Sequence, residues 1–223
     1  MNEISVIIRV KNEERWIGHA IQSVIENLPG SEIIIIDNNS TDNSIQIAKY
    51  FLKDPNLKYT DKLKYTNIKF FSIEQYTPGK SLNMGITEAS HNICFILSAH
   101  CIITNVDIAK IKNDLKIYKS IFGKQIPVWN GKKINPRYVW SHFVDREEIN
   151  MFSKLENRYF HHNAAAIYDR QFIIENPFDE ILQSKEDRYW AQDIIANGHK
   201  ILYDPKFAVH HHFTINGSTW RGI

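Results

Sequence analysis

Residues 31–42 have the sequence SEIIIIDNNSTD, an apolar run that ends abruptly in polar residues. Four consecutive isoleucines bounded by turn-forming residues are typical of a short strand buried on both faces, as in a parallel sheet. Asp37 closes this strand, and residues 38–42 form a polar turn with residues that favour helix starts. We therefore predict a strand that ends at Asp37, followed by a helix to about Phe51.

The segments on either side repeat this alternation of strand and helix. Residues 4–10 are a β-branched strand candidate, and apolar residues recur at helical spacing from 13 to 27. The other predicted elements are strands at 67–73 and 92–98, helices at 79–89, 107–122 and 185–196, and a polar loop at 53–66. This order predicts βαβ units and a Rossmann-like α/β domain with a mostly parallel central sheet flanked by helices.

The composition excludes several classes of protein. The 223 residues are 43% hydrophobic and carry a net charge of +2, which is too balanced for a dedicated nucleic-acid binder. The longest stretch without Asp, Glu, Lys or Arg, residues 89–106, is too polar to span a membrane, and the N-terminus is no signal peptide. We expect a cytoplasmic protein, with a peripheral membrane contact left open. Cys94 and Cys101 are expected to be reduced thiols.

Polar residues follow the predicted strands at 9–13, 37–42 and 98–101. In open α/β sheets, ligands bind outside the carboxyl ends of the strands. These three segments therefore predict one binding cleft. No G-x-G-x-x-G follows the first strand and the chain contains no G-x-x-x-x-G-K-[ST], which disfavours a dehydrogenase or a P-loop enzyme.

The chain resembles the family 2 glycosyltransferases, which have the GT-A fold. Residues 5–14, SVIIRVKNEE, resemble the family's first strand followed by Pro-Thr-Tyr-Asn-Glu, and residues 37–42, DNNSTD, resemble its Asp-Asp-Gly-Ser-Thr-Asp turn. Further matching segments are 79–85, 123–127, 177–180, 186–191 and 198–212. The resemblance implies a single GT-A catalytic domain over 1–223. Residues 1–106 would be its nucleotide-sugar-binding half, and 107–223 its acceptor-binding and catalytic half.

The resemblance also assigns residues to roles. It implies that Asp187 is the catalytic base, which Glu186 helps to orient, and that Gln125 and Trp190 bind the acceptor. The nucleotide-sugar-binding residues would be Arg9, Asn12, Glu13, Asp37, Asn39, Lys80, Ser98 and His100. Simpler readings stay open, because Asp37 could merely cap the next helix and Glu186-Asp187 could be a solvated pair at a helix start.

One departure from the family concerns the metal. The usual Asp-x-Asp, which holds a metal on the donor diphosphate, is replaced by Ser98-Ala99-His100, and Arg9 replaces a proline. The resemblance implies a divalent metal, Mn²⁺ or Mg²⁺, which His100 and His211 could hold. Alternatives are metal-independent transfer, in which Lys80 or Arg9 steadies the phosphate, or a histidine without function. On a strand, His210 and His212 would share one face and His211 the other.

These observations predict an inverting glycosyltransferase. It would move a sugar from a nucleotide-sugar donor to a hydroxyl of a glycan or lipid-linked acceptor in surface polysaccharide biosynthesis. Its partners would be that donor and that acceptor, with no nucleic acid. The alternative is a non-catalytic GT-A domain that binds glycan or a protein partner, for which the missing Asp-x-Asp is the argument.

Overall fold

The first half of the chain forms the parallel side of a single large sheet. The computed structural model describes residues 4–52, 67–135 and 138–220, so the predicted loop at 53–66 lies outside the described residues. The strands of this side are β1 (Ile4–Val10), β2 (Glu32–Asp37), β3 (Ile68–Ser72) and β4 (Ile93–Ser98), in the order β3-β2-β1-β4. The isoleucine run pairs in parallel with β1, from Ile33 opposite Val6 to Asp37 opposite Val10.

The second half adds mixed strands to the same sheet, whose order continues from β4 as β11-β6-β12-β5. These strands are β5 (Cys101–Asn105), β6 (Ser120–Trp129), β11 (Ala165–Asp169) and β12 (Ile201–His212), with the short β7 (Lys132–Lys133) and β8 (Glu148–Ile149) beside β6 and β12. The pair β9 (Phe152–Ser153) and β10 (Arg158–Tyr159) lies apart from the sheet. The α/β fold with a central sheet is therefore confirmed, with antiparallel pairing at β11 and β5.

The helices cover both faces of the sheet. They are α1 (Ile17–Asn27), α2 (Ser44–Lys49), α3 (Pro78–Glu88), α4 (Ile108–Asp114), α5 (Arg170–Glu175) and α6 (Glu186–Ala196), with 3₁₀ turns at Tyr138–His142 and Ser218–Trp220. Along β1, Val6 and Ile8 belong to the core beneath α1, whereas Ile7 packs with Leu82 and Ile86 of α3 on the opposite face. This alternation is the period-two pattern of a strand buried on both sides.

The predicted helix at 107–122 is wrong beyond Asp114. Helix α4 ends there, and Ser120 begins β6, which pairs with β11 on one side and with β12 on the other. The apolar residues Ile121 and Phe122 fit helical spacing, but in the strand they are buried on opposite faces of the sheet. Pairing on both edges outweighs helical periodicity here, and Gly123 is a poor helix former.

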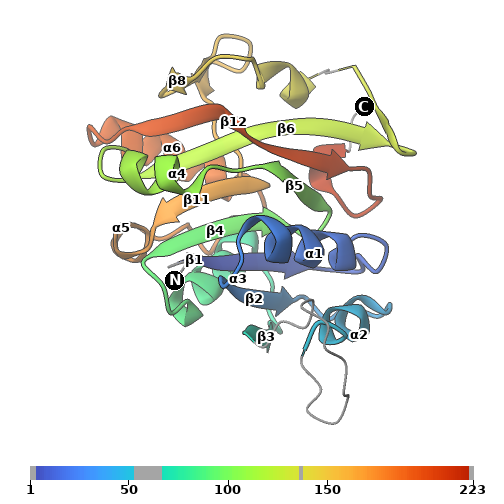
Figure 1. Cartoon of the computed structure of the whole chain (residues 1–223). Helices are drawn as coiled ribbons and strands as arrows, with labels where there is room; N and C mark the ends of the chain where they lie inside the picture. The colour runs from blue at the N-terminus through green and yellow to red at the C-terminus, as the bar shows by residue number, and fades with distance from the viewer. Residues whose placement is uncertain (1–3, 53–66, 136–137, 221–223) are drawn as a thin grey trace.

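Strand direction decides where the site forms. Because β4, β11 and β6 are successively antiparallel, β6 and its parallel neighbour β12 run in the same direction as β1, β2 and β4. In Figure 1 the arrows of β1, β2, β6 and β12 point the same way, and β11 points the opposite way. The carboxyl ends of the five strands therefore share one edge with the amino end of β11.

The structure bears on two expectations, one about the cysteines and one about membrane-spanning segments. Cys94 and Cys101 are buried free thiols, as expected. Among the described residues, no helix is both long enough and apolar enough to cross a bilayer.

Gly79 lets the start of α3 pack directly against the backbone near Asp179. A Cβ atom at Gly79 would lie 2.2 Å from the carbonyl oxygen of Asp179, which is too close for any side chain. Nearby, Asn83 donates from Nδ2 to the Phe178 carbonyl oxygen at 2.8 Å and accepts from the Phe178 N–H at 3.1 Å. This contact holds the segment that leads into α6 against the first half of the sheet.

The Gly79→Ala variant is expected to lower the free energy of unfolding by about 1–3 kcal/mol, because the added methyl must displace backbone. Urea denaturation followed by circular dichroism measures this difference. Thr87→Ala, on the exposed side of the same helix, is the control and should change stability by less than about 0.5 kcal/mol. Equal denaturation midpoints for Gly79→Ala and the wild type would contradict the close packing.

Candidate active site

The loops after β1 and β2 form one hydrogen-bonded unit. Asn12 and Asn39 both adopt the left-handed conformation, with φ of 53° and 51°, which asparagine tolerates better than most residues. The Asn12 Oδ1 atom accepts from the Thr41 N–H at 2.7 Å, and Lys11 Nζ donates to the Asn39 carbonyl oxygen at 2.6 Å. Both loops are thereby held at the edge where β1 and β2 end.

Asp37 uses one carboxylate oxygen to shape its own turn, because Oδ1 accepts from the Ser40 N–H at 3.0 Å. Asp37 does not cap helix α2, which begins at Ser44 with Asn43 in the N-cap position, and nucleotide binding by Asp37 stays a prediction. Ser98, at the end of β4, donates its N–H to the Ala164 carbonyl oxygen at 2.9 Å. Lys80 lines a cavity together with other residues of α3, the end of β3 and Glu180.

Two histidines meet at the centre of the strand edge. The register of β12 against β5 places His211 opposite Cys101, so His100, just before β5, lies beside it. Their Nε2 atoms are 2.9 Å apart, and His100 Nδ1 lies 3.3 Å from Glu13 Oε1. Glu13 Oε1 also accepts from the Thr214 hydroxyl at 3.1 Å. Glu13, His100 and His211 therefore form one chain of polar contacts.

The predicted alternation of the histidine triplet is confirmed. The rings of His210 and His212 are 6.2 Å apart on one face of β12, and His212 packs on Trp16 with ring centroids 4.1 Å apart. His211 faces the other side, where its ring meets Trp140 edge-on at 4.7 Å. Burial lowers the pKa of His211 well below its ordinary value, so the ring is neutral near neutral pH.

Gln125 connects this pair to another histidine. Its Oε1 atom lies 2.9 Å from His211 Nδ1, and its Nε2 atom lies 3.0 Å from His162 Nδ1. Gln125 is only 2% exposed, because β6 lies between β11 and β12. Its predicted role in acceptor binding stays a prediction, while both ends of its amide group are already bonded to histidines.

The predicted catalytic pair lies at the buried start of α6. Both oxygens of Asp187 accept backbone hydrogen bonds, from the Asn163 N–H at 3.1 Å and from the Arg188 N–H at 2.8 Å. Glu186 Oε1 lies 3.3 Å from Arg9 Nη1, which also donates to the Pro78 carbonyl oxygen at 3.2 Å. Arg9 thus links β1, α3 and α6, although the family usually has proline at this position.

Burial raises the pKa of Glu186, an effect that the Arg9 guanidinium opposes and the neighbouring Asp187 carboxylate reinforces. Burial also raises the pKa of Asp187, against the hydrogen bonds from Asn163 and Arg188. A carboxylate with a raised pKa accepts a proton more readily, which is what a general base requires. The pair is therefore not a solvated feature of a helix start.

Trp190, on the same helix, lies in the core. It is 4% exposed, its indole N–H donates to the Asn176 carbonyl oxygen at 2.7 Å, and its ring contacts Tyr168 and Phe178. Its predicted contact with the acceptor stays a prediction.

Sequence reasoning did not identify His161, His162 and Asn163, which precede β11 at the same edge. Asn163 lies behind Asp187, and the Tyr168 hydroxyl donates to Asn163 Oδ1. His161 Nε2 lies 3.0 Å from the Ser120 hydroxyl. The available signal was the polar triplet HHN directly before the apolar strand AAAIY.

The expected metal site would use the imidazole rings of His100 and His211. Within the described residues, no group of three or more His, Cys, Asp or Glu side chains is arranged to hold a metal ion. However, two nitrogen ligands at about 2.1 Å from one ion and at right angles would be about 3 Å apart, close to the 2.9 Å between His100 and His211. The pair therefore fits two positions of an ion whose other ligands come from elsewhere.

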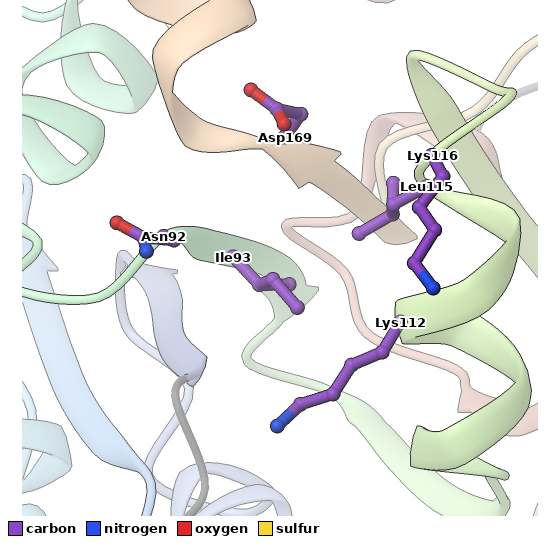
Figure 2. Close-up of a pocket in the computed structure, with 6 residues that line it drawn as sticks. All are labelled: Asn92, Ile93, Lys112, Leu115, Lys116 and Asp169. Carbon is purple, nitrogen blue, oxygen red and sulfur yellow. The ribbon is translucent and has the colours of Figure 1, made fainter.

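A second cavity lies at the opposite end of the sheet. Figure 2 shows Lys112 of α4, with Leu115 and Lys116 just after that helix, facing the start of β4 and Asp169 at the end of β11. It is distant along the strands from the edge where the histidines and carboxylates gather.

The chain matches glycosyl transferase family 2 over residues 5–176. A dolichyl N-acetyl-alpha-D-glucosaminyl phosphate 3-beta-D-2,3-diacetamido-2,3-dideoxy-beta-D-glucuronosyltransferase of Methanococcus voltae is 30% identical over 124 residues, 54% of this chain and 35% of that protein. The minor teichoic acid biosynthesis protein GgaA of Bacillus subtilis (strain 168) is 32% identical over 96 residues, 41% of this chain and 20% of that protein.

The fold also matches a solved structure. The crystal structure of S. aureus TarS 1-349 in complex with UDP has a TM-score of 0.68 and 20% sequence identity, over 95% of this chain and 60% of that chain. Each of these matches covers less than two thirds of the other protein. Because the family match spans most of the chain, the chain belongs to glycosyl transferase family 2.

The buried histidines predict a specific loss of stability in acid. Burial, together with the nearby His162 and Arg158, lowers the pKa of His161 to about 3. Below the unfolded pKa of about 6.5, the unfolded chain therefore binds a proton that the folded chain does not. His161 alone should reduce the free energy of unfolding by about 2 kcal/mol between pH 7 and pH 5.

The His161→Gln variant, which keeps an acceptor for Ser120, should lose less stability over this range than the wild type does. Urea unfolding at pH 8, 7, 6 and 5 measures both curves. Above pH 7.5 the two curves should differ by a constant, because neither state of the wild type protonates His161 there. Curves that stay parallel down to pH 5 would contradict a neutral, buried His161.

Proposed function

We propose that this chain is an inverting glycosyltransferase. It transfers a sugar from a nucleotide-sugar donor to a hydroxyl of a glycan or lipid-linked acceptor during the assembly of a surface polysaccharide. Residues 1–106 hold the donor, and residues 107–223 hold the acceptor and the base. The observation that carries the proposal is the buried Glu186-Asp187 pair, which lies at the same sheet edge as the polar chain from Glu13 to His211.

Asp187 performs the proton transfer in this proposal. As the acceptor oxygen attacks the anomeric carbon, one Asp187 oxygen takes the hydroxyl proton, and the bond between that carbon and the phosphate oxygen breaks. The configuration at the anomeric carbon is inverted, and the nucleotide leaves with the bonding electrons. The N–H groups of Asn163 and Arg188 fix the carboxylate in place. Arg9 balances the Glu186 charge, which makes burial of two adjacent carboxylates tolerable.

The donor is held at the ends of β1, β2 and β4. The loop unit of Asn12 and Asn39 lies beside Asp37, whose second oxygen is suited to accept from a nucleobase. The TarS structure of similar fold contains UDP, which supports a uridine nucleotide as the first donor to test. A lipid-linked acceptor would bring the protein to the inner face of the cytoplasmic membrane.

In this proposal, His100 and His211 would hold a divalent metal, Mn²⁺ or Mg²⁺, beside the donor phosphate. When bound, it supplies positive charge that stabilises the leaving phosphate. The electron paramagnetic resonance signal of free Mn²⁺ should decrease when protein and UDP are both present. His211→Phe should restore the free signal, whereas an unchanged decrease in that variant would exclude His211 as a ligand.

A purely glycan-binding role is disfavoured by the same geometry. Two adjacent carboxyl groups that are 6% and 9% exposed cost stability, and a surface that only binds glycan does not require them.

The Asp187→Asn variant should lose between about 100-fold and 10,000-fold in the rate of UDP release from UDP-GlcNAc or another accepted donor. Its affinity for UDP should change little, because the base does not contact the nucleotide. Asp193→Asn, an exposed position on the same helix, is the matched control and should keep the full rate. An Asp187→Asn protein that retains its rate would remove Asp187 as the base.

A further inference from the structure

We propose that Gln125 is a positioning residue that fixes the tautomers of the two histidines beside it. It makes His211 present an unprotonated Nε2 towards His100, and it keeps Nε2 of His162 protonated. The use of these atoms in donor binding rests on the proposed function, but the tautomers follow from the hydrogen bonds alone.

A backbone N–H group, which can only donate, determines the tautomer of His162. The Ala164 N–H donates to His162 Nδ1 at 3.3 Å. A backbone N–H is always a donor, so His162 Nδ1 carries no proton. Burial and the nearby Arg188 lower the pKa of His162 to about 4, so the ring is neutral and its proton is on Nε2. That nitrogen is 3.5 Å from the Thr219 hydroxyl.

The second step orients the Gln125 amide. The same unprotonated Nδ1 of His162 lies 3.0 Å from Gln125, so the amide must present its NH₂ group there. Its carbonyl oxygen then faces His211 Nδ1 at 2.9 Å and can only accept. His211 Nδ1 therefore carries a proton, and a ring that is 1% exposed between Trp140, Trp220 and the Gln125 amide holds only that one. The lone pair is left on Nε2.

The third step concerns His100. With His211 Nε2 unprotonated, the 2.9 Å contact between the two Nε2 atoms is made by a proton on His100. A cation between these two nitrogens needs both lone pairs. His211 already offers one, and His100 would carry its proton on Nδ1, where Glu13 Oε1 lies 3.3 Å away. Metal-binding histidines usually donate their other ring N–H to a carboxylate, a carbonyl oxygen or a water, which fixes the tautomer.

Only an amide suits this position in the sheet. Glutamine donates at one end and accepts at the other, whereas a carboxylate would accept at both ends and would repel the lone pair of His162 Nδ1. Its place in β6 is fixed by pairing with β12, where Gln125 lies opposite Val209, so the side chain has little freedom to turn away.

The test is long-range ¹H–¹⁵N correlation NMR of histidine-labelled protein at pH 7.5, with no metal or nucleotide added. His162→Gln and His211→Gln identify the two rings. The wild type should show the Nε2–H tautomer for His162 and the Nδ1–H tautomer for His211. Gln125→Met, of similar volume, should abolish the single Nδ1–H state of His211. Gln192→Met, which removes a glutamine bonded to Tyr159, should change neither ring.

A second measurement uses Mn²⁺ with UDP and keeps the proposal testable if Gln125→Met shifts several rings. Gln125→Met should weaken Mn²⁺ binding by about 10-fold to 100-fold, because it removes the hydrogen-bond partner of the metal-binding His211 ring. Thermal denaturation checks that the variant folds. The proposal is overturned if wild-type His211 carries its proton on Nε2, or if Gln125→Met leaves that ring unchanged.

The two proposals fail separately. Wild-type rings in the predicted tautomers, in a protein that accepts no nucleotide sugar, would support the role of Gln125 and refute the proposed function. Sugar transfer by a protein whose His211 carries its proton on Nε2 would support the proposed function and refute the role of Gln125.

Discussion

The 2.9 Å approach of His100 to His211 depends on the position of β12 between β6 and β5. Parallel pairing with β6 places the end of β12 at the edge where β1, β2 and β4 also end, and antiparallel pairing with β5 places His100 beside His211. From this point, a 3.3 Å contact leads to Glu13 on one side, and hydrogen bonds lead to Gln125 and His162 on the other. The polar centre of the proposed donor site is therefore a product of strand direction.

Charge balance connects this centre to α6. The start of α6 buries two adjacent carboxyl groups, which would be unstable without compensation. Arg9 supplies one positive charge from β1, and backbone N–H groups satisfy both oxygens of Asp187. The replacement of the family's usual proline by arginine thus has a structural role, because proline could make neither the ion pair nor the bond to Pro78. Burial raises the proton affinity that the proposed base requires, and these contacts limit that rise.

The sequence predicted β1 to β4 correctly, because each is a short apolar run closed by polar residues. It failed after Asp114, where residues at helical spacing belong to β6, since pairing with β11 and β12 is not visible locally. The contact between His100 and His211 was anticipated only through the family resemblance. The bridge from His211 through Gln125 to His162 was missed, because three separate strands bring these residues together and no short motif records their register.

Nucleotide binding tests the central claim most directly. Calorimetric titration of the protein with UDP, GDP, dTDP, CDP and CMP, each with Mn²⁺ and with EDTA, would measure both donor class and metal dependence. The account predicts that one nucleoside diphosphate binds, and that Mn²⁺ strengthens its binding. Absence of binding by every nucleotide, in protein shown to be folded, would contradict a donor site at this edge and favour a domain that only binds glycan or a partner.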